Sequence, residues 1–282
     1  MALSQRFLAS GFVLTIFAGA TVYLTLPYVW TPGPKRDLTQ VIGDPERGKY
    51  EARLGGCFSC HTDVKNKGVP LAGGRVMTTP FGDFRTPNIT PDRETGIGSW
   101  SLANFTQAMT KGLRPDGSHY YPAFPYTSYN RMSNQAIADL KAYLDTVPPT
   151  HNKIPSHNLQ FPLNIRRGLS VWKSLYFDPK LWTNNEEKSA KWNRGAYIVN
   201  GPGHCVECHT PRTLMGSLDT KQHLKGLAKG PDGEKIPDIS ADPKSGVGSW
   251  SKGDLIFLLK LGLTPDGDAV SGSMAEVVKD ST

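Results

Sequence analysis

Two short motifs in the chain, at residues 57–61 and 205–209, combine the residue types needed for cofactor chemistry. Both read Cys-x-x-Cys-His, and together they contain all four cysteines of the 282-residue sequence. In such a motif the two thiols can form thioether bonds to a haem, and the adjacent histidine can bind its iron as proximal ligand. The sequence therefore predicts two covalently bound haems c. The predicted attachment residues and proximal ligands are Cys57, Cys60, His61, Cys205, Cys208 and His209.

The same cysteine pairs could instead form a redox disulfide or part of a zinc site. A thioredoxin-like disulfide requires a βαβ context, and no such pattern surrounds either pair. A single zinc site made of all four cysteines would leave the two following histidines without a role. Haem attachment accounts for all four cysteines and both histidines.

The motifs belong to an internal repeat. Arg47-Gly48, the first Cys-x-x-Cys-His motif, the segment at 96–101 (Gly-Ile-Gly-Ser-Trp-Ser) and the segment at 112–117 recur later in the chain at offsets of 147 to 150 residues. The repeat predicts a first domain at residues 37–150 and a second at residues 186–282, below called the first and second copies. Residues 151–185, the connecting segment, are rich in proline and aromatic residues and are predicted to form a strap packed across both domains.

Distal iron ligands are predicted from methionines that follow each motif. Met274, in a Gly-Ser-Met loop, would make the second haem six-coordinate and raise its potential. The repeat places Phe124 at the matching position of the first copy, and phenylalanine cannot bind iron.

Four side chains are available as substitutes in the first copy. Met132, eight residues after Phe124, is predicted as the ligand if the intervening loop folds inward. His119 would give bis-histidine ligation and a lower potential, while Met109 and Met77 fit a core and a turn respectively. An open iron is a further alternative.

Short amphipathic helices are predicted over residues 99–112 and 249–262, and a third helix after the N-cap Ser133. No long alternating pattern predicts a strand. The matching position for the third helix in the second copy falls at Ser281-Thr282, so the second domain is predicted to be C-terminally truncated and Met274 unusually exposed. Domains this small bury little apolar surface, and a haem would serve as the centre of each core.

The N-terminal segment contains an uncharged run at residues 7–26. As a helix it would span ~30 Å, the thickness of a bilayer's hydrocarbon core. A cleaved signal peptide with a site at residues 18–20 is the alternative. The sequence predicts a transmembrane anchor at residues 1–30. Because covalent haem attachment in bacteria is expected outside the cytoplasmic membrane, it also predicts a single-pass inner-membrane protein with haem domains in the periplasm.

Composition excludes several classes of protein. An apolar fraction of 38% and a charged fraction of 20% exclude a polytopic membrane protein and a disordered chain. The sequence has no dinucleotide-binding, Walker or His-Glu-x-x-His motif, so hydride and phosphoryl chemistry would belong to a partner. The net charge of +7 is spread along the chain without interleaved aromatic residues, and no nucleic-acid partner is predicted.

With these motifs the chain resembles the membrane-anchored, multi-haem cytochrome c subunits of bacterial periplasmic dehydrogenases that act on alcohols, gluconate or fructose. The resemblance rests on both haem motifs and on the segments at 79–82, 87–92, 121–126 and 158–172. It implies an all-α fold with two tandem cytochrome c-like domains and long loops behind the anchor. It also implies electron transfer from a dehydrogenase or respiratory complex to quinone or a terminal oxidase. Better-known members of the family carry three haems, and they commonly have methionine at the position of Phe124.

Two functions follow from these observations. The favoured one is an electron-transfer subunit of a respiratory chain, without catalytic residues of its own. The alternative is a dihaem enzyme, similar to a peroxidase or thiosulfate dehydrogenase, with an open iron in the first domain. Its acid and base groups would be Arg114, His119, Tyr120 and Tyr121.

Overall fold

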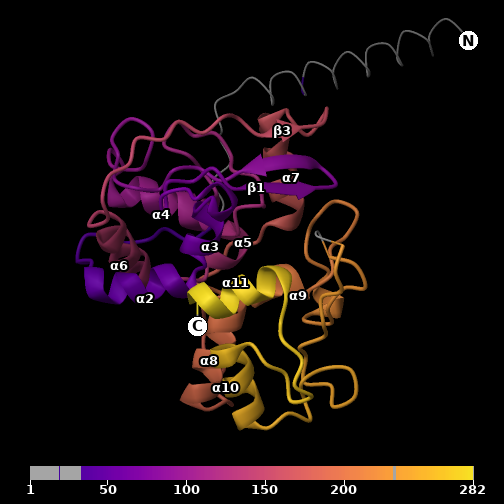
Figure 1. Ribbon diagram of the computed structural model, residues 1–282. Helices are drawn as coiled ribbons and strands as arrows, with labels where there is room; N and C mark the ends of the chain where they lie inside the picture. Colours follow the sequence, from indigo (N-terminus) through magenta and orange to yellow (C-terminus); the bar gives the residue numbers. More distant parts are fainter. Residues whose placement is uncertain (1–18, 20–32, 231–232, 282) are drawn as a thin grey trace, which may run out of the picture.

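The structure is a computed structural model that describes residues 19, 33–230 and 233–281. Its helices form two groups, with α2 to α6 in the first copy and α8 to α11 in the second (Figure 1). The helices of the first copy are α2 (Pro45–Leu54), α3 (Cys57–His61), η1 (Val64–Asn66), α4 (Leu102–Lys111), α5 (Tyr126–Tyr129) and α6 (Asn134–Leu144). The connecting segment contains η2 (Arg166–Gly168) and α7 (Leu169–Tyr176). The second copy contains α8 (Ala190–Asn200), α9 (Cys205–His209), η3 (Thr220–Gln222), α10 (Lys252–Leu261) and α11 (Gly272–Ser281).

Matching caps begin and end α4 and α10. Ser101 and Ser251 each form a capping box, in which the serine side chain accepts from the backbone N–H three residues later. Gly112 and Gly262 end the helices in the left-handed conformation, with φ of 59° and 72°. The helices predicted over 99–112 and 249–262 are confirmed, as is α6, which begins after its cap Ser133.

In the first copy, α2 crosses α6 at a glycine. A Cβ atom at Gly48 would lie 1.9 Å from the carbonyl oxygen of Asp139, so only glycine permits this approach. Beside the crossing, Arg47 Nε donates to Asp139 Oδ2 at 2.8 Å, and the backbone N–H of Asp44 donates to Asp139 Oδ1 at 2.8 Å. Burial would raise the pKa of Asp139, but hydrogen bonds, first that from Arg47, hold it below its usual value. The ion pair therefore fixes α2, which leads directly into the first haem motif.

The all-α prediction is wrong in one respect, because the structure contains a small antiparallel sheet of order β1-β2-β3. Strands β1 (Val76–Thr79) and β2 (Gly82–Arg85) form a hairpin, and β3 (Asn158–Leu159) comes from the connecting segment. Strands of two to four residues are too short to show an alternating pattern. The third strand pairs with a partner more than 70 residues away, which local sequence cannot reveal.

The predicted transmembrane helix is also corrected. Within residues 19, 33–230 and 233–281, no helix is both long enough and apolar enough to cross a membrane. The predicted segment at 1–30 lies outside the described residues, apart from Gly19. The described residues therefore do not support the predicted transmembrane helix, nor the single-pass inner-membrane location that depended on it.

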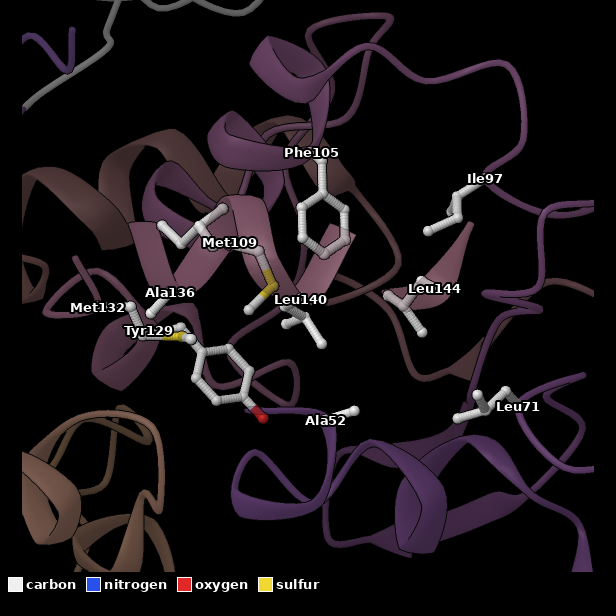
Figure 2. Close-up of a cluster of buried hydrophobic side chains, with 11 residues drawn as sticks. Ala52, Leu71, Ile97, Phe105, Met109, Tyr129, Met132, Ala136, Leu140 and Leu144 are labelled. Carbon is white, nitrogen blue, oxygen red and sulfur yellow. The ribbon is translucent and has the colours of Figure 1, made fainter. Parts of the chain in front are cut away.

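The core of the first copy is a cluster of buried apolar side chains (Figure 2). They converge from α2, α4, α6 and the loops between them. The cluster consists of Ala52, Leu71, Ile97, Phe105, Met109, Tyr129, Met132, Ala136, Ile137, Leu140 and Leu144. Cys57 and Phe58, from the first haem motif, pack against it. The first haem motif is therefore anchored on the main apolar core.

The second copy has a much smaller apolar core in the described part of the chain. There, no side chain of α10 or α11 is buried. Apolar residues of α10 are instead exposed, with Ile256 at 51% and Leu261 at 62%. Within these ranges the helices of the second copy bury less apolar surface than their counterparts in the first.

The connecting segment contacts both copies. Lys173 of α7 donates through Nζ to the carbonyl oxygens of Lys111 and Gly112, at 2.7 and 2.8 Å, at the end of α4. The neighbouring Trp172 donates its indole N–H to the carbonyl oxygen of Met215 in the second copy, at 2.7 Å. One helix thus holds the end of α4 and the loop that follows the second haem motif.

Candidate haem sites

The first haem motif forms the one-turn helix α3, which follows α2 after a tight turn. Gly56 precedes Cys57 in the left-handed conformation, with φ of 62°. At the other end of α3, His61 Nδ1 lies 2.8 Å from the carbonyl oxygen of Pro87. A carbonyl oxygen only accepts, so Nδ1 carries the proton and donates. The bond fixes the ring and leaves Nε2 deprotonated for a metal.

The second motif reproduces this arrangement. In α9, His209 Nδ1 donates to the carbonyl oxygen of Pro237 at 2.9 Å. Pro87 and Pro237 occupy equivalent positions of the repeat, 150 residues apart. Burial lowers the pKa of both His61 and His209, against an opposing effect of the proline carbonyls. Both imidazoles are therefore held neutral, the form that binds iron.

The four cysteines of the two motifs are free of disulfide bonds. Burial raises the pKa of the Cys57 thiol to about 12. Reactive and redox-active cysteines have lowered pKa values, so the structure does not favour a redox disulfide. Among the described residues, no three His, Cys, Asp or Glu side chains gather in a way that could hold a metal ion, which also disfavours a four-cysteine zinc site.

Met132 lies in the core of the first copy. Its side chain is 1% exposed and belongs to the same apolar cluster as Met109 and Tyr129 (Figure 2). Cys57 packs against this cluster. Phe124 is partly buried against the same cluster, with its ring 5.7 Å from that of Tyr129. The segment between Phe124 and Met132, which contains α5, thus turns toward the core of the first copy.

His119 is fully buried beneath the connecting segment. Its carbonyl oxygen accepts from Arg166 Nη1 at 2.7 Å. Burial, followed by the charges of Lys173 and Arg166, lowers the pKa of the His119 ring to about 4. The ring is therefore neutral at physiological pH, and the backbone of this residue is hydrogen-bonded to the connecting segment.

Met274 lies in a helix, where the sequence predicted a loop. Residues 272–281 form α11, which packs against α10 of the second copy and against α2 and α3 of the first. Glu276 of this helix forms an ion pair with Arg75, which also donates to the carbonyl oxygen of Ser59 in α3. Met274 itself is half-buried. The segment that carries it therefore lies between the two copies (Figure 1).

Two buried charged residues with a possible role at the site, Lys173 and Glu207, were not predicted from the sequence. Lys173 is 1% exposed, and its Nζ lies 4.6 Å from the centre of the Tyr126 ring. Glu207, inside the second haem motif, has a side chain that is only 8% exposed. A lysine among the apolar residues of segment 169–176 is a weak signal that Lys173 is buried. Nothing in the local sequence indicates that Glu207 is buried.

Comparisons with known proteins agree with this geometry. The Cytochrome c family matches residues 46–148. A "Diheme cytochrome c-type" protein of Cereibacter sphaeroides is 41% identical over 99% of this chain and 93% of its own length. The fructose dehydrogenase cytochrome subunit of Gluconobacter japonicus is 38% identical over 83% of this chain. The cytochrome c subunit of a quinone-dependent alcohol dehydrogenase from Gluconobacter oxydans is 40% identical over 84% of it.

The chain spans about half the length of these two dehydrogenase subunits, 48% and 50% respectively. It spans nearly all of the dihaem protein, whose name states the number of haems that the two motifs predict. The resemblance to dehydrogenase cytochrome subunits is confirmed. The chain belongs to the family of dihaem c-type cytochromes and carries two covalently bound haems c.

Proposed function

We propose that this cytochrome accepts electrons from a dehydrogenase and passes them through its two haems to a downstream acceptor such as quinone or a terminal oxidase. The observation that carries the proposal is the matched pair of proximal sites, in which His61 and His209 donate to equivalent proline carbonyls. Two haem sites with the same proximal arrangement suit a protein that passes single electrons from one haem to the next. The named functions of the dehydrogenase relatives support the choice of donor.

In this proposal the haems supply one-electron redox chemistry, and the chain holds and insulates them. Cys57, Cys60, Cys205 and Cys208 would form the thioether bonds. His61 and His209 would bind iron through Nε2, while the proline carbonyls keep each ring in its orientation. The apolar cluster of the first copy would keep water away from its haem, which would stabilise the less charged, reduced state. Because haem c is attached outside the cytoplasmic membrane, we place the haem-bearing domains in the periplasm.

We assign Met132 and Met274 as the distal ligands. Met132 is supported by its place in the cluster that contacts Cys57. Met274 is supported by the repeat alone, which aligns it with Phe124, a position at which the family commonly has methionine. Replacement of either by alanine should lower the midpoint potential of one haem, since methionine ligation raises it. Spectroelectrochemical titration measures this, with Met215→Ala as control because Met215 is 58% exposed. Unchanged potentials in Met132→Ala would remove Met132 from the assignment.

The proposed function is tested by the electron donor. The holoprotein is purified in mild detergent with its associated proteins, and candidate substrates such as ethanol, fructose or gluconate are added anaerobically. We expect one of them to reduce both haems, which stopped-flow absorption records, and an added quinone analogue or oxidised acceptor to reoxidise them. If the associated dehydrogenase turns over its substrate with an artificial dye while both haems stay oxidised, the proposal is wrong.

A further inference from the structure

The second haem motif is bonded directly to the first copy through Glu207. This residue lies between Cys205 and Cys208 in α9. Its Oε1 accepts from the hydroxyls of Thr127 and Ser128, each at 2.6 Å. Its Oε2 accepts from Arg212 Nη2 at 2.7 Å. A nearly buried carboxylate with three donors, one of them charged, is held in a single orientation.

The two hydroxyl donors come from the segment of the first copy that leads to its proposed distal ligand. Thr127 and Ser128 belong to α5, between Phe124 and the assigned ligand Met132. The helix that attaches the second haem is therefore hydrogen-bonded to the distal segment of the first haem site. The repeat offers a comparison, because Ser59 occupies the position of Glu207 in the first motif. Its hydroxyl donates only to the carbonyl oxygen of Gly56, within its own turn, at 3.0 Å.

A second contact joins the beginnings of the two motifs. His204, which precedes Cys205, lies edge to face against Tyr129, with ring centres 5.5 Å apart. A Cβ atom at Gly56, which precedes Cys57, would lie 3.4 Å from His204 Nε2. The Tyr129 hydroxyl in turn donates to the carbonyl oxygen of Gly55 at 2.5 Å. The N-terminal ends of α3 and α9 thus meet.

These contacts bring together α3 and α9, the two helices whose cysteines would form the thioether bonds. Each haem would be held by two thioether bonds to its own helix, α3 or α9, so the orientation of α9 relative to the first copy would set the gap between the two haems. Electron exchange between haems falls steeply as that gap widens. The carboxylate of Glu207 and the ring of His204 hold α9 against the first copy.

From these contacts we infer that Glu207 is a positioning residue that sets the rate of electron exchange between the two haems. The inference rests on the proposed function only in that both haems must accept electrons. It does not depend on which dehydrogenase or acceptor is the partner. Glu207 acts by holding α9 against Thr127 and Ser128 and has no direct part in the redox chemistry.

The test measures exchange inside one molecule. A single electron is introduced into the oxidised holoprotein by pulse radiolysis, and its redistribution between the haems is followed by absorption. Glu207→Ala should slow redistribution by about tenfold or more, because small misplacements of reacting groups have large kinetic effects. The double variant Thr127→Val, Ser128→Ala removes both hydroxyl donors without touching a haem motif, and it should reproduce the effect.

Glu207→Gln separates geometry from charge, because its amide oxygen still accepts from both hydroxyls. We expect exchange within about threefold of the unaltered protein in this variant, since the positioning bonds remain. Glu187→Ala, an exposed glutamate of the second copy, is the matched control and should leave the rate unchanged. Haem content and spectra verify that each variant is intact.

Unaltered exchange in Glu207→Ala, or in the Thr127, Ser128 double variant, would overturn the inference. If Glu207→Ala fails to take up both haems, the double variant decides the question alone. An electron that never enters either haem in the unaltered protein would instead refute the proposed function, because the pulse supplies it without any partner.

Discussion

Replacing Cys57 and Cys60 by alanine will yield a chain with one covalent haem instead of two. The two thiols are the only attachment groups in the first motif, and Cys57 packs against the apolar core of the first copy. A haem is larger than any side chain, so its loss from that core should cost more than about 5 kcal/mol in the free energy of unfolding, the upper end for truncating one buried residue. Mass spectrometry and haem staining of the denatured chain measure the haem content.

The reciprocal variant, Cys205→Ala with Cys208→Ala, is the matched comparison. It should keep the first haem and lose the second. We expect it to lose more helix by circular dichroism, because the described part of α10 and α11 contains no buried side chain to maintain those helices without a haem. Two haems per chain in either variant, after denaturation and extraction of non-covalent haem, would show that the motifs are not the attachment sites.

Replacing Lys173 by methionine will destabilise the protein and remove a dependence of stability on pH. Lys173 donates to two carbonyl oxygens at the end of α4, and its loss leaves both unsatisfied, at a cost of about 3 kcal/mol. Burial lowers the pKa of Lys173 to about 7, whereas a lysine in the unfolded chain has a pKa of about 10.4.

The sign of the pH effect follows from these two pKa values. Between pH 7 and pH ~10.4 the unfolded chain binds a proton at Lys173 that the folded protein does not, so stability rises with pH. Each pH unit in this window contributes up to about 1.4 kcal/mol. Because the methionine variant lacks this contribution, the difference between the two proteins should widen from pH 7 to pH 10. Urea unfolding followed by circular dichroism measures it at each pH.

Lys180→Met serves as control for this prediction. Lys180 is 69% exposed and pairs with the equally exposed Asp178. Its replacement should change the free energy of unfolding by less than about 0.5 kcal/mol, with the pH dependence intact. A Lys173→Met protein with the stability and pH dependence of the unaltered chain would show that the connecting segment does not depend on this lysine.

Helices with strong local end signals were predictable from sequence. Ser101, Ser133 and Ser251 cap the helices that follow them, and Gly112 and Gly262 end two of them, because caps and left-handed glycines act within one turn. The sheet was not predictable, since its third strand comes from the connecting segment. The helix α11 was also missed, because part of what surrounds it, including the ion pair of Glu276 with Arg75, comes from the first copy.

The haem motifs were readable from sequence because their function depends on adjacent residues. The bond from His61 to the carbonyl of Pro87 was not, since nothing in a spacing of 26 residues specifies which backbone oxygen will meet the imidazole. Glu207 shows the same limit more clearly. Its donors Thr127 and Ser128 stand about 80 residues earlier, and only the packing of one copy against the other brings them together.

Both haems are expected to be electron carriers with no open coordination position for a substrate. The most direct test of this expectation is an optical titration of the purified holoprotein, reduced stepwise and then exposed to carbon monoxide, with cyanide and peroxide added to the oxidised form. We expect the uptake of two electrons per chain and two low-spin spectra that none of these ligands changes. A high-spin haem that binds carbon monoxide, or that consumes peroxide with turnover, would contradict the electron-carrier function and favour a dihaem enzyme.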